Sequence, residues 1–259
     1  MIADIKEVFQ FRELIFALAM REVRVRYKHS LLGVAWALVM PLSLMLVFTG
    51  IFSRVASIDT GGVPYALFAY VGLVPWQLHA TIIQNGARCL SDNSNLVTKV
   101  YFPREVLPLA IVGSALADFC VAALLVGGLM AYYQVAPGLG LLLLPVILAV
   151  QLCLGLGLAL LLSAMNLFYR DVQFVLQVGV TLWMFASSVV YPIPATGELA
   201  WLAWVNPMTP ILDAYRSAVI GGTATLSPAF GAAAAASVIL LFLCWRWFRR
   251  VERAFGELA

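Results

Sequence analysis

The sequence predicts an all-α integral membrane protein with six transmembrane helices. It also predicts an N-terminal amphipathic interface helix and short re-entrant helices between spans 5 and 6. Of the 259 residues, 63% are apolar and only 11% are charged, and the mean hydropathy is +0.96. A soluble domain keeps about a quarter of its residues charged. The apolar residues also fall in long charge-free runs, and about 20 such residues cross the hydrocarbon core.

The charge-free runs define the spans. Four runs contain no charged residue: 30–53, 60–87, 172–197 and 217–245. A further stretch, 106–169, contains one charge and is long enough for two spans separated by a turn at Pro137 and Gly138. We therefore expect spans at about 33–53, 64–86, 106–133, 140–164, 172–191 and 226–247. Residues 1–30 then form a cytoplasmic interface segment, 31–250 the membrane domain and 251–259 a cytoplasmic tail.

The distribution of positive charge predicts the orientation. The chain has sixteen lysines and arginines, and all except Arg54 and Arg216 lie in the N-terminal segment, the loops after spans 2 and 4, or the C-terminal end from residue 246 onward. Such residues concentrate on the cytoplasmic side of a membrane. We expect both termini to be cytoplasmic, in a bacterial inner membrane. The net charge of +3 thus reflects orientation, and no basic patch with aromatic partners suggests nucleic-acid binding.

The segment before span 1 has the pattern of an interface helix. Apolar residues recur at helical spacing from Ile5 to Leu18, with charged residues between them. Residues 22–27 alternate like a strand, which opposes the helical interpretation there. An alternative is that the segment only anchors span 1 by its positive charge. Because the first 30 residues carry ten charges, we expect no cleavable signal peptide.

Two connecting segments have distinctive compositions. The loop 88–104 is polar, and Ser91 or Asp92 is placed to cap a short helix that ends before Pro103. Its role is either docking to a partner or simple connection. Residues 191–210 are apolar but contain four prolines, which favours two short helices at the outer interface with Trp201 and Trp204 at headgroup depth.

Several classes of chemistry lack their residues. The chain has only two histidines, His29 and His79, so no serine–histidine pair or metal-ligand cluster is predicted. We expect His79 to be a packing residue. No glycine precedes a lysine in the pattern of a phosphate-binding loop. The intramembrane carboxylate Asp118 either serves proton coupling or hydrogen-bonds to a neighbouring helix.

Local motifs resemble those of ABC-2-type permeases of polysaccharide exporters. The segment REVRVRYKHSLLGVAW (21–36) resembles their approach to span 1, and LVTKVYFPREVLP (96–108) resembles the loop after their second span. NLFYRDV (166–172), YPIP (191–194) and VNPMTPI (205–211) are similar to later segments of the family, in the same order. The pattern is most similar to the branch that exports O-antigen and teichoic acid.

The resemblance implies a homodimeric permease with two copies of a separate ABC ATPase subunit. This chain would hold no cofactor, and ATP and Mg would be bound by the partner ATPase. The substrate would be a lipid-linked polysaccharide, in contact with membrane lipid as well as with the chain.

The same resemblance suggests roles for four groups of residues. The ATPase-coupling loop would comprise Asp92, Asn93, Ser94, Asn95, Leu96, Val97 and Lys99, with Leu96 and Val97 as apolar anchors. The cytoplasmic entrance would comprise Arg21, Arg24, Arg26, Tyr27, Tyr169, Arg170 and Asp171. The channel lining would comprise Trp36, Phe48, Phe174, Gln177, Thr181, Trp183 and Phe185, since aromatic rings stack on sugar faces and polar groups bind hydroxyls. The outer gate would comprise Tyr191, Pro192, Pro194, Trp201, Trp204, Asn206 and Pro207.

Three alternatives remain at this point. An ABC-2 permease for capsule, a drug or a small lipid would have the same architecture. A proton-coupled secondary carrier would use Asp118. An intramembrane enzyme would need a catalytic pair that the sequence does not offer.

Overall fold

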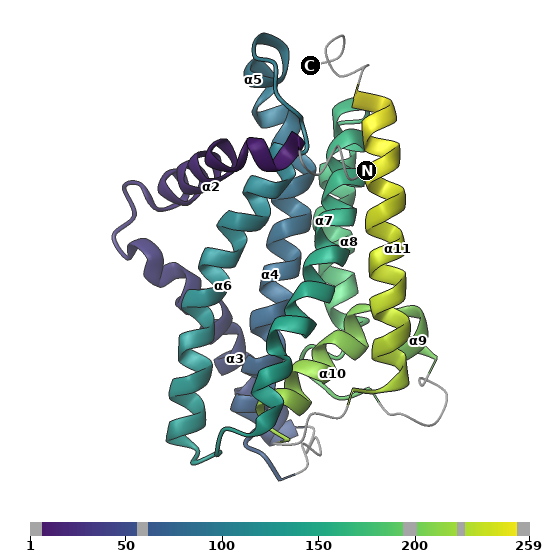
Figure 1. Ribbon diagram of the computed structural model, residues 1–259. Helices are drawn as coiled ribbons and strands as arrows, with labels where there is room; N and C mark the ends of the chain where they lie inside the picture. Colours follow the sequence, from purple (N-terminus) through teal and green to yellow (C-terminus); the bar gives the residue numbers. More distant parts are fainter. Residues whose placement is uncertain (1–6, 56–61, 194–200, 222–225, 253–259) are drawn as a thin grey trace.

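The described part of the chain is entirely helical, as predicted. The computed structural model describes residues 7–55, 62–193, 201–221 and 226–252. No strand occurs within these ranges. Figure 1 shows an elongated bundle of helices in which the first and the last described residues lie near the same end. We call this the terminal end; here lie α2 (Arg12–Tyr27), α5 (Ser94–Lys99) and the C-terminal end of α11 (Pro228–Val251). We call the other the distal end; here lie α9 (Leu202–Val205) and α10 (Met208–Val219).

Five helices are long and apolar enough to cross a membrane. These are Gly33–Phe52, which joins η1 (Gly33–Ala35) to α3 (Trp36–Val55), α4 (Tyr65–Asp92), α6 (Val106–Tyr132), Leu139–Phe168, which joins η2 (Leu139–Leu143) to α7 (Leu144–Phe168), and α11 (Pro228–Val251). They match five of the six predicted spans within a few residues.

The fifth predicted span is shorter than expected. The sequence predicts a helix over 172–191, but α8 (Val172–Phe185) has 14 residues and is therefore about 21 Å long. The hydrocarbon core is about 30 Å thick, so α8 does not cross it unaided. The chain leaves helical geometry after Phe185, and the residues that follow accept hydrogen bonds from Asn206, before α10 (Met208–Val219), and from Arg216 within it.

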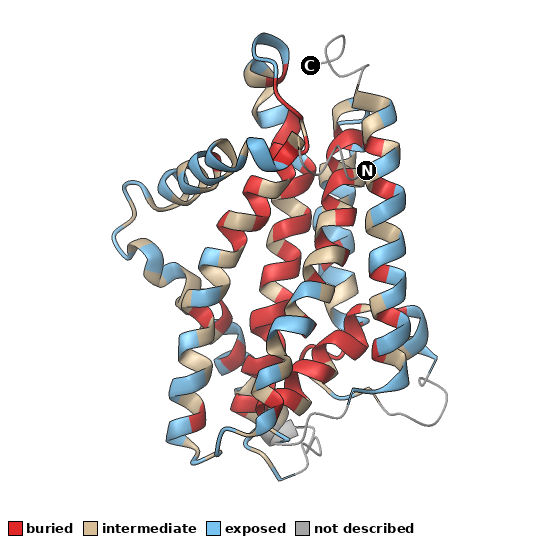
Figure 2. Cartoon of the chain, viewed as in Figure 1, coloured by how far each residue is buried: buried red, intermediate tan, exposed pale blue. Residues whose placement is uncertain are grey.

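Helix α4 is the centre of the bundle. In its apolar window 89% of residues are buried, against 11% for the first long helix, and Figure 2 shows α4 red along most of its length. Small residues permit this packing: a Cβ atom on Gly86 would lie only 2.6 Å from the Cβ of Ala159 on α7. Close approach at small residues is a usual way for membrane helices to associate.

Helix α2 (Arg12–Tyr27) runs across the bundle at the terminal end (Figure 1). Its apolar residue Leu18 is buried in a cluster with α6, and Leu14 and Ile15 pack against the same cluster. The helix continues through residues 22–27, so their strand-like alternation is misleading. One face of α2 therefore packs on the protein, while Phe16 on another face is exposed.

The loop after α4 contains the predicted short helix, α5 (Ser94–Lys99). Its N-cap is Asn93, without a side-chain capping hydrogen bond, because α4 extends through Asp92. The expected caps Ser91 and Asp92 thus belong to the preceding helix, and the Asn93 side chain instead donates to the carbonyl of Cys89.

Two short helices also follow the break in span 5, namely α9 (Leu202–Val205) and α10. Trp201 and Trp204 are both exposed beside α9. Pro194 lies outside the described residues. The broken, proline-rich composition predicted the two short helices; their depth in a membrane stays a prediction.

Candidate functional site

The most informative surface of the molecule is one narrow face of α4. Every residue from 66 to 90 is buried except five, and all five are polar. They are Gln77, Thr81, Gln84, Asn85 and Arg88. Their spacing of three and four residues places them on one side of the helix, and we call them the α4 stripe.

The stripe is unusual for a membrane helix. A face of α4 that contacted lipid would be apolar, because hydrocarbon cannot satisfy amide groups. The amides of Gln77, Gln84 and Asn85 make no hydrogen bond with the described residues. The stripe was not predicted from the sequence, although the helical spacing of its first four residues falls within the predicted span 64–86. The face of α4 left open by its own subunit is thus suited to a hydrated, polar contact.

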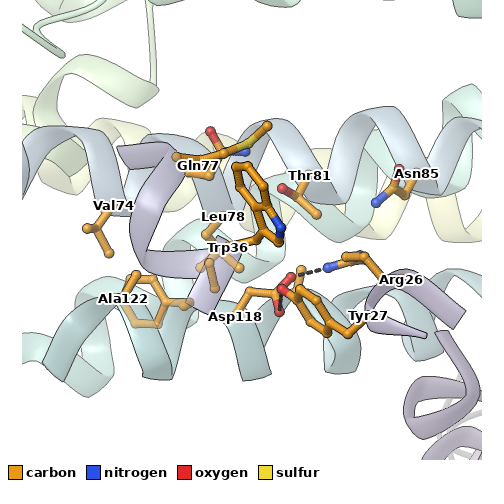
Figure 3. Close-up of a pocket in the computed structure, with 14 residues that line it drawn as sticks. Arg26, Tyr27, Trp36, Val74, Gln77, Leu78, Thr81, Asn85, Asp118 and Ala122 are labelled. Atoms are coloured by element: carbon orange, nitrogen blue, oxygen red, sulfur yellow. Dashed lines mark hydrogen bonds and ion pairs between the residues drawn. The ribbon is translucent and has the colours of Figure 1, made fainter. Parts of the chain in front are cut away.

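A cavity of about 400 Å³ lies on one side of the stripe. It is bounded by α4, the end of α2, α3 and α6, and Gln77, Thr81 and Asn85 line it (Figure 3). The ring of Trp36, from the start of α3, stands over α4 near Gln77 and Thr81. This combination of an aromatic ring with amide and hydroxyl groups can bind a sugar ring and its hydroxyls.

Asp118 lies in the same cavity and is held by α2. Its carboxylate forms an ion pair with Arg26 and accepts a hydrogen bond of 2.7 Å from the hydroxyl of Tyr27 (Figure 3). Burial, followed by the hydrogen bond to Asp118, raises the pKa of Tyr27 to about 12, so the phenol remains a donor. Of the two sequence-based interpretations, the geometry matches the hydrogen-bonded one. A proton carrier at Asp118 would have to break the Arg26 pair.

A second cavity, of about 420 Å³, lies between α4 and α8. The α4 stripe contributes Gln84 and Arg88. The remaining lining comes from α8: Gln173, Phe174, Leu176, Gln177 and Thr181. The stripe therefore has a cavity on each side, one opening toward α3 and one toward α8. We call the stripe with its two cavities the polar groove.

The predicted channel-lining residues divide into two groups. Trp36, Phe174 and Phe185 are exposed, as are Gln177 and Thr181. Two others face the interior of the subunit instead. Phe48 stacks on Phe52 with ring centroids 6.0 Å apart.

Trp183 is the second inward-facing residue. Its indole packs edge-on against His79, with a centroid distance of 5.0 Å, and against Trp76. Its Nε1 atom donates to Oδ1 of Asn206 at 2.9 Å. His79 itself is fully buried, as expected of a packing residue. Trp183 thus belongs to the packing between α8 and α4 and does not line the polar groove in this conformation.

The predicted entrance residues do not form one cluster. Arg26 and Tyr27 line the first cavity, and Arg21 donates to Asn93 Oδ1 at 2.5 Å, which joins α2 to the loop before α5. Arg24 is exposed beside them on α2. The exposed residues Tyr169, Arg170 and Asp171 lie between α7 and α8 and line neither cavity of the groove.

The coupling loop presents other residues than the expected anchors. Val97 is only 1% exposed and Leu96 packs against the same cluster, so both are used within the subunit. The exposed apolar residues are the two that follow α5, Val100 and Tyr101, the latter 84% exposed. Among the predicted polar residues, Asp92, Asn95 and Lys99 are exposed, and Asn93 and Ser94 are partly buried.

The predicted outer-gate residues surround the end of α8. The hydroxyl of Tyr191 donates to the carbonyl of Phe185, and Asn206 bridges Trp183 and the residues after α8. Pro192 and Pro207 flank these segments. Across the described ranges, no group of three or more histidine, cysteine or acidic residues could hold a metal ion.

Comparison with known proteins identifies the family. Residues 13–220 match the ABC-2 type transporter family. The chain belongs to this family. ABC-2 chains are membrane components of transport systems, which agrees with the polar groove and with the five long apolar helices. The match includes the interface helix, the groove and the segment around α10.

Named relatives of this ABC-2 chain are export or transport proteins. It is 32% identical to the O-antigen export system permease protein RfbA of Myxococcus xanthus, over 99% of each chain. It is 27% identical to a protein of the same name from Klebsiella pneumoniae, over 81% of each. Identity to the polysialic acid transport protein KpsM of Escherichia coli is 24%, over 92% of this chain and 93% of the relative.

Proposed function

We propose that this chain is the permease of an ATP-driven exporter that moves a lipid-linked polysaccharide out of the cytoplasm. The observation that carries the proposal is the α4 stripe: the only face of the central helix that its own subunit leaves uncovered is polar. A polymer of sugars needs a hydrated path with many weak contacts. Amide and hydroxyl groups beside Trp36 and Phe174 supply such contacts, without the tight binding that many charged groups would cause.

A second copy of the chain would complete the path. The polar groove is open on the side of the exposed faces of α3 and α8. In a monomer this would leave polar side chains of α4 toward lipid, which is unfavourable. A homodimer that brings the α3 and α8 faces of two copies together would enclose two stripes around one channel.

The energy would come from two copies of a separate ATPase subunit, which bind ATP and Mg. This chain lacks a phosphate-binding loop, and the terminal end carries most of its arginines and lysines. By the charge rule this end is cytoplasmic in a bacterial inner membrane. Exposed Val100 and Tyr101 at that end are suited to contact a partner protein.

The substrate is more specifically of the O-antigen kind. Identity to the two O-antigen export permeases exceeds identity to the polysialic acid transport protein. The alternative substrates are a capsular polysaccharide, teichoic acid, a drug or a small lipid. A proton-coupled mechanism is disfavoured because Arg26 already neutralises Asp118.

The test is polymer export by cells that lack their own permease and express this chain with its ATPase. Gln177→Leu removes an amide from the groove, and we expect export to slow about tenfold, the effect of roughly one hydrogen bond. Val178→Leu is the matched control, because Val178 is exposed on α8 but does not line the groove. Thermal stability should match the wild type in both variants.

The inward-facing Trp183 gives the opposite pattern. Trp183→Ala should lower the free energy of unfolding by about 3–5 kcal/mol, with export and yield falling together. Equal export by Gln177→Leu and Val178→Leu would contradict the groove as the path. If cells that express the chain export a drug and display no polysaccharide on their surface, the result would favour the alternative substrates.

A further inference from the structure

We propose that Asn206 and Arg216 are positioning residues that hold the end of α8 unwound and thereby set which face of α8 meets the polar groove. The proposal rests on the proposed export function for its biological meaning. Its structural basis is the set of hydrogen bonds that Asn206 and Arg216 donate to carbonyl groups after Phe185.

The unwound stretch is buried, so its backbone needs partners. Residues 187–190 are all buried, although α8 has ended. Non-helical backbone at membrane depth is tolerated only where other protein groups satisfy it. Side chains supply two of these partners: Tyr65 donates to the carbonyl of Val190 at 2.7 Å, and Arg216 donates to the carbonyl of Val189 at 2.6 Å.

Asn206 binds both sides of the break. Its Nδ2 atom donates to the carbonyl of Ala186 at 3.0 Å and to Oγ of Ser187 at 2.8 Å. Its Oδ1 atom accepts from Nε1 of Trp183 at 2.9 Å and from the backbone N–H of Met208 at 3.1 Å. One side chain therefore fixes the last turn of α8, the unwound residues and the start of α10.

Arg216 secures the same stretch from the other side. Its guanidinium donates to the carbonyl of Val189 at 2.6 Å, pairs with Asp213 at 3.2 Å and lies 3.9 Å from the ring centroid of Phe68. The arginine is buried. At Gly72 on α4, a Cβ atom would lie 2.3 Å from the same Val189 carbonyl. The Val189 carbonyl and Arg216 therefore leave no room for a side chain at position 72.

Capture of Trp183 determines the rotation of α8. Successive residues of an α-helix are separated by about 100° around its axis, so Trp183 lies about 180° from Phe174 and about 160° from Thr181. When Asn206 holds Trp183 against α4, Phe174 and Thr181 lie on the opposite face of α8, where they are exposed and line the open side of the second cavity. Asn206 and Arg216 therefore set which side chains of α8 line the polar groove, although neither residue lines the groove itself.

The test measures rotation of α8 by cysteine labelling. Single cysteines at Thr181 and Leu182 are placed in a background with the four native cysteines replaced, and an aqueous thiol reagent is applied to membranes. Thr181 lines the groove, whereas Leu182 is exposed beside it. We expect the wild-type rate ratio of the two sites to exceed five. Asn206→Leu or Trp183→Phe should reduce that ratio toward one.

Conservative variants distinguish positioning from a merely structural role. Asn206→Asp keeps the acceptor for Trp183 but loses the donor to Ala186 and Ser187, so it should retain only part of the labelling ratio. Arg216→Lys should retain more of the ratio than Arg216→Met. Thr209→Val is the matched control, because its hydroxyl is buried in the same segment with no partner among the described residues. It should leave the ratio unchanged.

Two results separate the inference from the proposed function. If Asn206→Leu does not fold, Trp183→Phe still tests the positioning role, because it removes the Nε1 donor to Asn206 and keeps an aromatic ring. An unchanged ratio in Trp183→Phe, or an equal loss in Arg216→Lys and Arg216→Met, would overturn the positioning role. The labelling needs no transport, so a wild-type chain that exports no polymer would overturn the proposed function alone.

Discussion

The role of Asp118 can be assigned only when its neighbours in the structure are known. In the sequence it is an isolated carboxylate within 64 residues of apolar chain. In the structure, Arg26 and Tyr27 from α2 reach it across the first cavity. No spacing rule relates positions 26 and 118, so the pair could not be predicted from sequence. Its effect is to pin the end of the interface helix to α6.

Breaking this pair should destabilise the chain. Asp118→Asn keeps an acceptor for Tyr27 but leaves Arg26 without its counter-charge, and a hydrogen bond to a charged group contributes about 2 kcal/mol. We expect a loss of this order in thermal unfolding of the purified chain. The double variant with Arg26→Gln should recover part of it. Additive losses would mean that the two groups do not interact.

Because of Glu105, at the start of α6, we expect the folding stability to depend on pH. Burial raises the pKa of its carboxyl above the ordinary value, against the opposing effect of Arg249, whose Nε atom lies 2.5 Å away. Folding therefore favours the protonated form. The stability contributed is fully present below the ordinary pKa of about 4.3 and is lost as the pH rises through the raised pKa.

Glu105→Gln remains neutral at every pH and tests this direction. The melting temperature of the wild type should fall relative to that of Glu105→Gln as the pH is raised from about 5 to about 8. Parallel curves for the two proteins would contradict the shift.

At the scale of elements, the long helices were predictable and the break in span 5 was not. Residues 186–190 are small or apolar, so hydropathy extends the span through them. The break depends on Asn206 and Arg216, about 20 and 27 residues later in the chain. Local propensity cannot register partners at that separation. The α4 stripe, by contrast, lies within one helix, so the helical spacing of its polar residues could have been predicted from the sequence.

The second element to test is the loop at α5. Tyr101 is exposed, whereas Val97 is buried in the subunit's own cluster. Truncation of an anchor at an interface costs about 2 kcal/mol or more, so Tyr101→Ala should weaken recovery of the ATPase about 30-fold. The measurement is the dissociation constant of the ATPase from purified permease. Thr98→Ala, exposed on the same loop, should have little effect; equal affinities in both variants would exclude Tyr101 as an anchor.

The whole molecule is polarised, with most positive side chains at the terminal end and aromatic residues such as Trp201 and Trp204 at the distal end. A cysteine in place of Asn95, which is exposed at α5, should react with a membrane-impermeant thiol reagent only after permeabilisation. A cysteine in place of Tyr132, exposed where α6 ends, should react in intact cells. Both variants need the four native cysteines replaced, and the reverse pattern would invert the topology.

The centrality of α4 has a consequence for biogenesis. Its mean hydropathy is 1.4, the lowest of the five long helices, whose other values run from 2.0 to 2.5. Polar residues raise the free energy of inserting a single helix into lipid. The helix that organises the finished bundle is thus the one that lipid retains least strongly on its own. During synthesis, α3 and α6, its neighbours in the chain, would cover its polar residues from lipid, since both contact α4 in the finished bundle. We therefore expect these three helices to be inserted as one unit.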